Sequence, residues 1–85
     1  MQTETVFHPE QLIPFVHAQH PLRRDVIRAL QLCNPGQWIN SRVVQLVVGE
    51  RGQPVKEQLI IQTAPESSMI LDVLWDGRIS RIEFL

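Results

Sequence analysis

The sequence predicts an α+β fold in which two N-terminal helical segments pack on one face of a four-stranded antiparallel β-meander. Apolar residues recur at spacings of three and four between Pro21 and Cys33, which is the period of an amphipathic helix. From Gln37 onward, short runs rich in β-branched residues are separated by polar turns. Two of these runs flank Asp76-Gly77, a strong hairpin signal. The 85 residues are expected to form a single domain, residues 1–85.

The N-terminal part supplies the two helical segments. Residues 8–10 (His-Pro-Glu) have the proline and the carboxylate of a helix start, so a first helix or turn is expected over residues 9–18. Pro14 lacks a backbone N–H and is expected to bend or interrupt this segment. A second helix is predicted over residues 21–33, and the Asn-Pro-Gly sequence at 34–36 ends it. Because this helix is apolar on one side only, we expect it to lie on a flat surface.

Four strands joined by short connections are expected to follow. The first is predicted at Trp38–Gly49 and the second at Val55–Ala64, with a polar loop between them and a turn at 65–68. The last two strands are the arms of the hairpin around residues 76–77. Consecutive strands with short connections pair in antiparallel order, which predicts the meander.

The turn residues of the C-terminal hairpin also predict which residues of its two strands pair. With a two-residue type I′ loop at Asp76-Gly77, Leu74 lies opposite Ile79 and Asp72 lies opposite Arg81. Opposite charges in such a pair stabilise the register by about 0.2–1 kcal/mol. One face of the hairpin then carries the residues Met69, Leu71, Val73, Ile82 and Phe84. The other face carries the charged pair with Ile70, Leu74 and Ile79. A type I turn with a glycine bulge, which shifts the pairings by one residue, is an open alternative.

Composition and charge exclude several classes of protein. Eight basic and nine acidic residues give a net charge of −1, whereas binding to nucleic acid or to anionic membranes usually requires a basic excess. A single cysteine allows no internal disulfide. The N-terminus contains acidic residues and lacks a long apolar run, so we expect no secretory signal. A cytoplasmic protein is the resulting prediction.

The predicted sheet has more apolar residues than two short helices can cover. A sheet with one face in water alternates apolar and polar residues, but both parities of these strands carry large apolar side chains. We expect the second face to be covered by another protein chain, most simply a second copy in a homodimer. The interface residues predicted on the hairpin are Ile70, Leu74, Ile79 and Arg81. The alternative is that sheet twist and the N-terminal segment bury these apolar residues within one chain.

Histidine and cysteine residues do not predict a reactive site. His17 and His20 have the spacing of two metal ligands, and His8 and Cys33 lie elsewhere, but zinc requires three or four ligands that converge. Cys33 falls on the apolar side of its helix, where a free cysteine behaves as a small buried hydrophobe. We therefore predict no metal ligand, no cofactor and no cysteine nucleophile.

Acidic, basic and glycine residues likewise have structural explanations. Asp76 is a turn residue and Asp72 has a basic partner opposite, so no catalytic residue is predicted. The G-x-x-G at 49–52 resembles the backbone clamp of nucleic-acid-binding KH domains, but it lies between two strands and is expected to be a simple connection. A platform of aromatic and basic residues on the sheet would be the remaining route to nucleic-acid binding. Its members would be Trp38, Trp75, Arg42, Arg78 and Arg81.

Residues 73–82 (VLWDGRISRI) resemble the last hairpin of NTF2-like proteins, in which helices also precede an antiparallel sheet. The resemblance covers about ten of the 85 residues and identifies no functional residue. It implies a small-molecule-binding protein or minor enzyme, with Phe15, Trp38 and Trp75 lining a pocket between helices and sheet. The function that we favour is a small non-enzymatic interaction module that self-associates or docks on a larger protein through an apolar sheet face.

Overall fold

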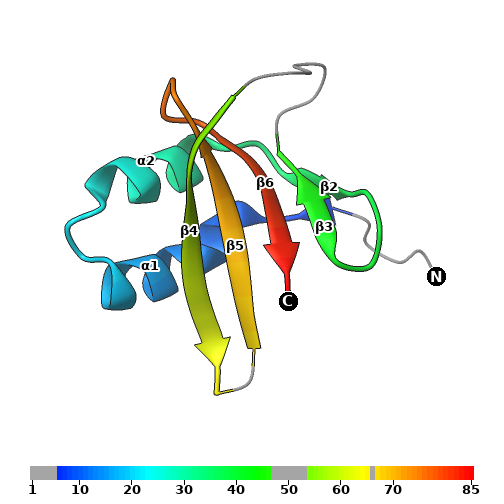
Figure 1. The fold of residues 1–85 in the computed structure, drawn as a ribbon, viewed down its shortest axis with the longest axis horizontal. Coiled ribbons are helices and arrows are strands. Elements are labelled where there is room, and N and C mark those ends of the chain that lie inside the picture. Colours follow the sequence, from blue (N-terminus) through cyan, green and yellow to red (C-terminus); the bar gives the residue numbers. More distant parts are fainter. Residues whose placement is uncertain (1–5, 47–53, 66) are drawn as a thin grey trace.

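The computed structural model describes residues 6–46, 54–65 and 67–85. It consists of one six-stranded antiparallel sheet with two α-helices on one face (Figure 1). The predicted α+β class is confirmed, but the predicted number of four strands is wrong. In chain order, the elements are β1 (Val6–Phe7), the 3-10 helix η1 (Pro9–Leu12), α1 (Ile13–Gln19), α2 (Arg24–Leu32), β2 (Gly36–Trp38), β3 (Val43–Gln45), β4 (Val55–Ala64), β5 (Ser67–Leu74) and β6 (Ile79–Phe84).

Two prolines explain how the first helical segment is built. Pro9 opens η1, and Pro14 lies in the first turn of α1. At both positions the missing N–H would have had no partner within its helix, so neither proline breaks a helical hydrogen bond. The interruption predicted near Pro14 is therefore a change from a 3-10 helix to an α-helix at residue 13.

The second helix, α2, begins at Arg24 rather than at Pro21. The N–H of Arg23 donates to the carbonyl oxygen of His20 (3.0 Å), which closes a turn between the two helices. Val26 and Leu30, one turn apart on α2, are buried against the sheet, as the apolar spacing predicted.

The strand predicted at Trp38–Gly49 is divided into β2 and β3. Asn40 accounts for the division, because its side-chain oxygen accepts a hydrogen bond from the N–H of Arg42 (2.8 Å) and forms a turn. The N–H of Ile39 donates to the carbonyl oxygen of Val43 (2.8 Å) across the same turn. Residues 47–49 of the predicted strand lie outside the described residues.

The strand order is β1-β2-β3-β6-β5-β4, so the predicted meander is only partly correct. Strands β4, β5 and β6 follow one another as a meander, but β3 pairs with β6 rather than with its neighbour in sequence, β4. Consequently β4, which has ten residues, is an edge strand. The short strand β1 forms the opposite edge.

The hairpin between β5 and β6 adopts the alternative with a glycine bulge. The N–H of Gly77 donates to the carbonyl oxygen of Leu74 (3.0 Å), and the N–H of Leu74 donates to that of Arg78 (2.8 Å), which encloses a three-residue loop. Gly77 has a φ of +90°, a conformation that glycine adopts without strain. The two-residue type I′ loop and the pairing of Leu74 with Ile79 were therefore wrong predictions.

A second irregularity restores the register further along the hairpin. Ile79 lies opposite Val73, whereas Arg81 lies opposite Asp72, so Ser80 is an extra residue on β6. The predicted pairing of Asp72 with Arg81 is confirmed, and Met69 lies opposite Phe84. The bulge turns Ile79 toward the helices, and this corrects our prediction that Ile79 shares a face with Ile70.

The core lies between the helices and the sheet. Its buried members are Leu12, Val16, Val26, Leu30, Val44, Leu59, Ile61, Met69, Leu71, Val73, Ile79 and Ile82. Figure 1 views the sheet from the opposite side, where the ribbons of β4, β5 and β6 lie in front of both helices. We call this opposite side, which no described helix covers, the helix-free face.

Candidate functional site

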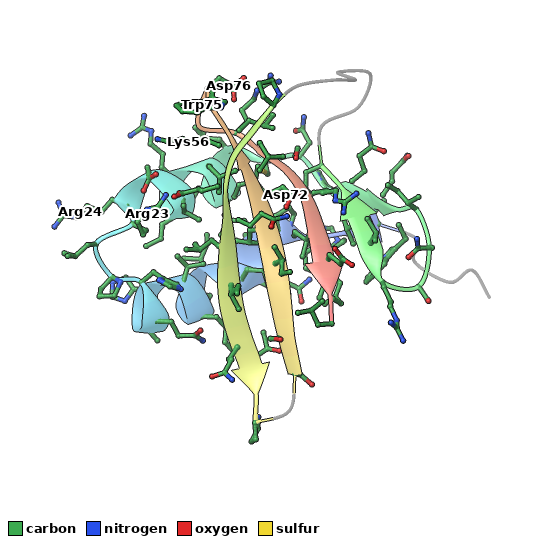
Figure 2. All side chains as sticks on the ribbon, viewed as in Figure 1. Arg23, Arg24, Lys56, Asp72, Trp75 and Asp76 are labelled. Carbon is green, nitrogen blue, oxygen red and sulfur yellow. The ribbon has the colours of Figure 1, made fainter. Side chains whose placement is uncertain are left out.

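The centre of the helix-free face is polar. Asp72, on β5, is only 6% exposed, although no helix of the described residues covers this face. Its carboxylate accepts a hydrogen bond from the side-chain amide of Gln58 on β4 (3.0 Å) and forms an ion pair with Arg81 on β6 (Nε to Oδ2, 3.1 Å). Arg81 lies opposite Gln45 of β3. A row of polar residues thus crosses four strands, with Asp72 near its middle (Figure 2).

The next row along the same face is mainly apolar. Ile60 of β4 lies opposite Ile70 of β5, which lies opposite Glu83 of β6. Val43 of β3 completes the row. Ile60 is 57% exposed, and Ile70 and Val43 are half-buried. This row is the apolar surface that the helix-free face presents near its centre.

Of the four residues predicted to contact a partner, two have substantial accessible surface. Ile70 is half-buried, and the side chain of Arg81 is 46% exposed. Leu74 and Ile79 are 1% and 0% exposed, respectively, within this chain. Contact with a partner stays a prediction. Ile60 was not among the predicted interface residues, although its position between Leu59 and Ile61 indicates the face opposite to the core.

The tip of the hairpin presents an exposed aromatic ring at one end of the sheet (Figure 2). Trp75 is 68% exposed, and the ammonium nitrogen of Lys56 lies 5.8 Å from its ring centre, within reach of a cation–π interaction. Beside it, the Asp76 carboxylate pairs with the Arg78 guanidinium (2.6 Å) and accepts a hydrogen bond from the Arg78 N–H (3.0 Å). These contacts hold the pKa of the Asp76 carboxyl below its ordinary value.

The outer edge of β4 is partly capped by the end of the first helix. The Gln19 side chain bonds both backbone groups of Gln62: its oxygen accepts from the Gln62 N–H (2.8 Å), and its amide nitrogen donates to the Gln62 carbonyl oxygen. The ring nitrogen Nε2 of His20 lies 3.0 Å from the carbonyl oxygen of Ile60. These side chains occupy positions at which a further strand would otherwise pair.

Ion pairs link the beginning of α2 to β4. The Arg23 guanidinium bonds both carboxylate oxygens of Asp25 (3.1 and 3.0 Å) and also pairs with Glu57 of β4. The bond from Arg23 holds the pKa of the Asp25 carboxyl below its ordinary value. The two carboxylates in turn raise the pKa of Arg23. Arg23 and Asp25 therefore remain charged at neutral pH.

An open pocket of about 780 Å³ lies between α2 and the hairpin turn. Its volume falls within the range of small-molecule sites, about 300–1,000 Å³. The wall comes from α2, the segment that follows it, the residue after β3 and the start of β6. The lining residues are Asp25, Arg28, Ala29, Leu32, Cys33, Asn34, Pro35, Leu46, Gly77, Arg78 and Ile79. None of Phe15, Trp38 and Trp75, the lining predicted from the NTF2-like resemblance, is among them.

Two of those three aromatic residues, Trp38 and Trp75, lie away from the pocket. Trp38 stacks on Phe84 (ring centres 5.3 Å apart), and both rings contact Phe7 edge to face. Trp75 lies at the hairpin tip. Sequence reasoning missed the pocket because its wall residues come from three separate stretches of the chain, and no spacing within any one stretch indicates that they meet.

The reactive residues singled out in the sequence lie apart from one another. Within residues 6–46, 54–65 and 67–85, no three side chains among His, Cys, Asp and Glu gather so that they could hold a metal ion. Cys33 lines the pocket, where burial raises the pKa of its thiol; the Ile79 N–H partly opposes this shift. The thiol is therefore protonated at neutral pH, which disfavours nucleophilic chemistry.

The basic residues predicted for a nucleic-acid platform are likewise separated. Arg42 lies beside the end of β6, because the N–H of Phe84 donates to its carbonyl oxygen (2.7 Å), whereas Arg78 precedes the start of β6. Arg81, between them, is paired with Asp72. The G-x-x-G at 49–52 lies outside the described residues.

No helix among the described residues is long and apolar enough to cross a membrane. Comparison with known proteins finds no matching family model, no similar curated protein and no similar solved structure.

Proposed function

We propose that this protein is a small non-enzymatic interaction module whose helix-free face binds a second protein chain, most simply another copy of itself. One observation carries the proposal: both helices pack on the same side of the sheet, and no helix among the described residues lies on the opposite side. That side presents Ile60 at 57% exposure beside half-buried Ile70 and Val43. Burial of an exposed isoleucine side chain contributes about 1.5–3 kcal/mol.

Charge on the helix-free face supports pairing with a second copy. The face carries the acids Asp72 and Glu83 close to the base Arg81. A two-fold axis places the same patch on both partners, so a self-complementary patch needs both signs of charge. With both signs present, one copy can offer Arg81 to the acids of the other while the apolar row is buried between them.

The size of the face is also sufficient. The molecule measures 40 × 32 × 21 Å, so its broad sides are the faces of the sheet and of the helix layer (Figure 1). A stable interface of standard size buries about 800 Å² on each partner. An interface centred on the apolar row, with the polar row at its side, fits within one broad face.

The test is the molar mass measured by light scattering and sedimentation over a wide concentration range. We expect a dimer that persists in high salt, because an apolar interface is not weakened by screening. Ile60→Lys is expected to shift the protein to monomer without loss of the fold, since Ile60 is exposed in a single chain. The matched control is Leu22→Lys, which changes a residue that is 90% exposed in the turn between α1 and α2.

The outcomes separate the possibilities. If both lysine variants remain dimeric, the dimer uses another surface and the proposed interface is wrong. If the unmodified protein is a monomer at every concentration, self-association is contradicted. The substitutions of Leu74 and Ile79 that the predicted hairpin would suggest are unsuitable, because both residues are buried and their replacement would unfold the chain.

A further inference from the structure

The pocket between α2 and the hairpin turn combines an apolar wall with excess positive charge. Its apolar lining residues with accessible surface include Ala29, Leu32 and Leu46. Leu32 is 72% exposed, so a ligand lying against it would remove apolar surface from water. These features favour a ligand with an apolar body.

Three charged side chains border the pocket: Asp25, Arg28 and Arg78. Asp25 is bonded by Arg23 through both carboxylate oxygens. Arg78 is paired with Asp76. Among the described residues, no carboxylate pairs with Arg28, whereas Arg78 pairs with Asp76 and Asp25 shares the guanidinium of Arg23 with Glu57. The pocket therefore favours a ligand that brings a negative charge to Arg28.

We propose that this pocket binds a small amphipathic monoanion, namely a carboxylate with an aromatic or aliphatic body. The carboxylate pairs with the Arg28 guanidinium, and the apolar body lies along Leu32 and Leu46. A doubly charged ligand is disfavoured, because the carboxylate of Asp25 lies at the same rim. The site does not involve the helix-free face, so this proposal goes beyond the interaction module and is independent of it.

The two exposed arginines of α2 provide a matched pair of variants. Arg28 lines the pocket, whereas Arg24, one turn earlier, does not. Both are exposed, and neither forms an ion pair within the described residues. Arg28→Gln and Arg24→Gln therefore remove the same charge from the same helix, at the pocket in one case and away from it in the other.

The experiment measures dissociation constants for 1-naphthoate and decanoate by calorimetry and by amide chemical-shift changes. The uncharged probes are 1-naphthalenemethanol and decanol. We expect Arg28→Gln to weaken binding of each carboxylate about tenfold, and Arg24→Gln to change it less than about twofold. The uncharged probes are expected to bind the unmodified protein about tenfold more weakly than the carboxylates and to be insensitive to Arg28→Gln.

The reactivity of the Cys33 thiol gives a second readout, which reports whether the bound ligand lies in this pocket. It lines the pocket and is the chain's single cysteine, so the rate of its reaction with N-ethylmaleimide reports on that position. Saturating naphthoate is expected to slow this reaction at least threefold. The proposal is overturned if neither carboxylate binds at millimolar concentration, if the two arginine variants weaken binding equally, or if bound naphthoate leaves the labelling rate of Cys33 unchanged.

Discussion

Replacement of Asp72 by Asn tests whether the buried carboxylate holds strands β4, β5 and β6 together. Asp72 bonds Gln58 through Oδ1 and pairs with Arg81 through Oδ2. Asparagine has nearly the same shape but accepts hydrogen bonds at only one side-chain oxygen. Whichever way the amide of Asn lies, one of the two neighbouring donors then faces an N–H group.

The exposed fractions of the two partners set the expected magnitude. A hydrogen bond to a charged group contributes about 1.5–3 kcal/mol when buried. The Asp72 side chain is 9% exposed but that of Arg81 is 46% exposed, so solvent screening reduces this contribution. We expect Asp72→Asn to lower the free energy of unfolding by about 1–2 kcal/mol. For a domain of this size, each kcal/mol lowers the melting temperature by about 4–8 °C.

Urea unfolding followed by tryptophan fluorescence measures this loss. A double-mutant cycle with Arg81→Gln is expected to give a coupling energy of about 1 kcal/mol. Glu83→Gln is the control, because Glu83 lies 3.5 Å from the same guanidinium and is 40% exposed, so its loss should change stability by less than about 0.5 kcal/mol. If Asp72→Asn costs no more than Glu83→Gln, or if the cycle is additive, the pair does not hold the strands.

Two further predictions concern backbone packing and the thiol. Gly36→Ala is expected to lower the free energy of unfolding by about 1–3 kcal/mol, because the added Cβ would lie 2.4 Å from a methyl group of Leu46 and 2.5 Å from one of Val44. Urea unfolding measures this, and an unchanged midpoint would show that β2 and β3 can separate freely. The raised pKa of the Cys33 thiol means that stability is unaffected below the ordinary cysteine pKa of about 8.5 and falls as pH rises above it, because the unfolded chain releases the proton first. Unfolding at pH 7 and 9.5 should show this loss in the unmodified protein and a smaller one in Cys33→Ser; equal losses would refute it.

The sequence predicted those secondary-structure elements well whose signals lie within a single short segment of the chain. The apolar spacing of α2 and the arms of the hairpin follow from residues close together in the chain. The pairing of Asp72 with Arg81 was predicted from a two-residue loop, and it is correct because the bulge at Ser80 offsets the extra loop residue. Asn40, a residue type typical of turns, lies within the predicted strand 38–49 and separates β2 from β3.

Long-range arrangement could not be predicted in the same way. The pairing of β3 with β6 depends on which strands share an edge, and hydrophobic alternation is the same for either neighbour. The bulge at Ser80 decides whether Ile79 faces the helices or the helix-free face. The apolar surface predicted for the second face of the hairpin was overestimated by two residues, because Ile79 faces the helices and Leu74 is also buried within this chain. The pocket depends on three stretches of the chain that meet only in the folded protein.

The bonds from Gln19 and His20 to the edge of β4 link the stability of the first helix to the behaviour of the whole protein in concentrated solution. Helix α1 has seven residues, so it has little stability apart from its packing. When α1 detaches in a local opening, the backbone groups of Ile60 and Gln62 lose their side-chain partners together. The longest strand of the sheet then becomes an open template for other chains. Resistance to aggregation thus depends on a short helix rather than on the stability of the sheet.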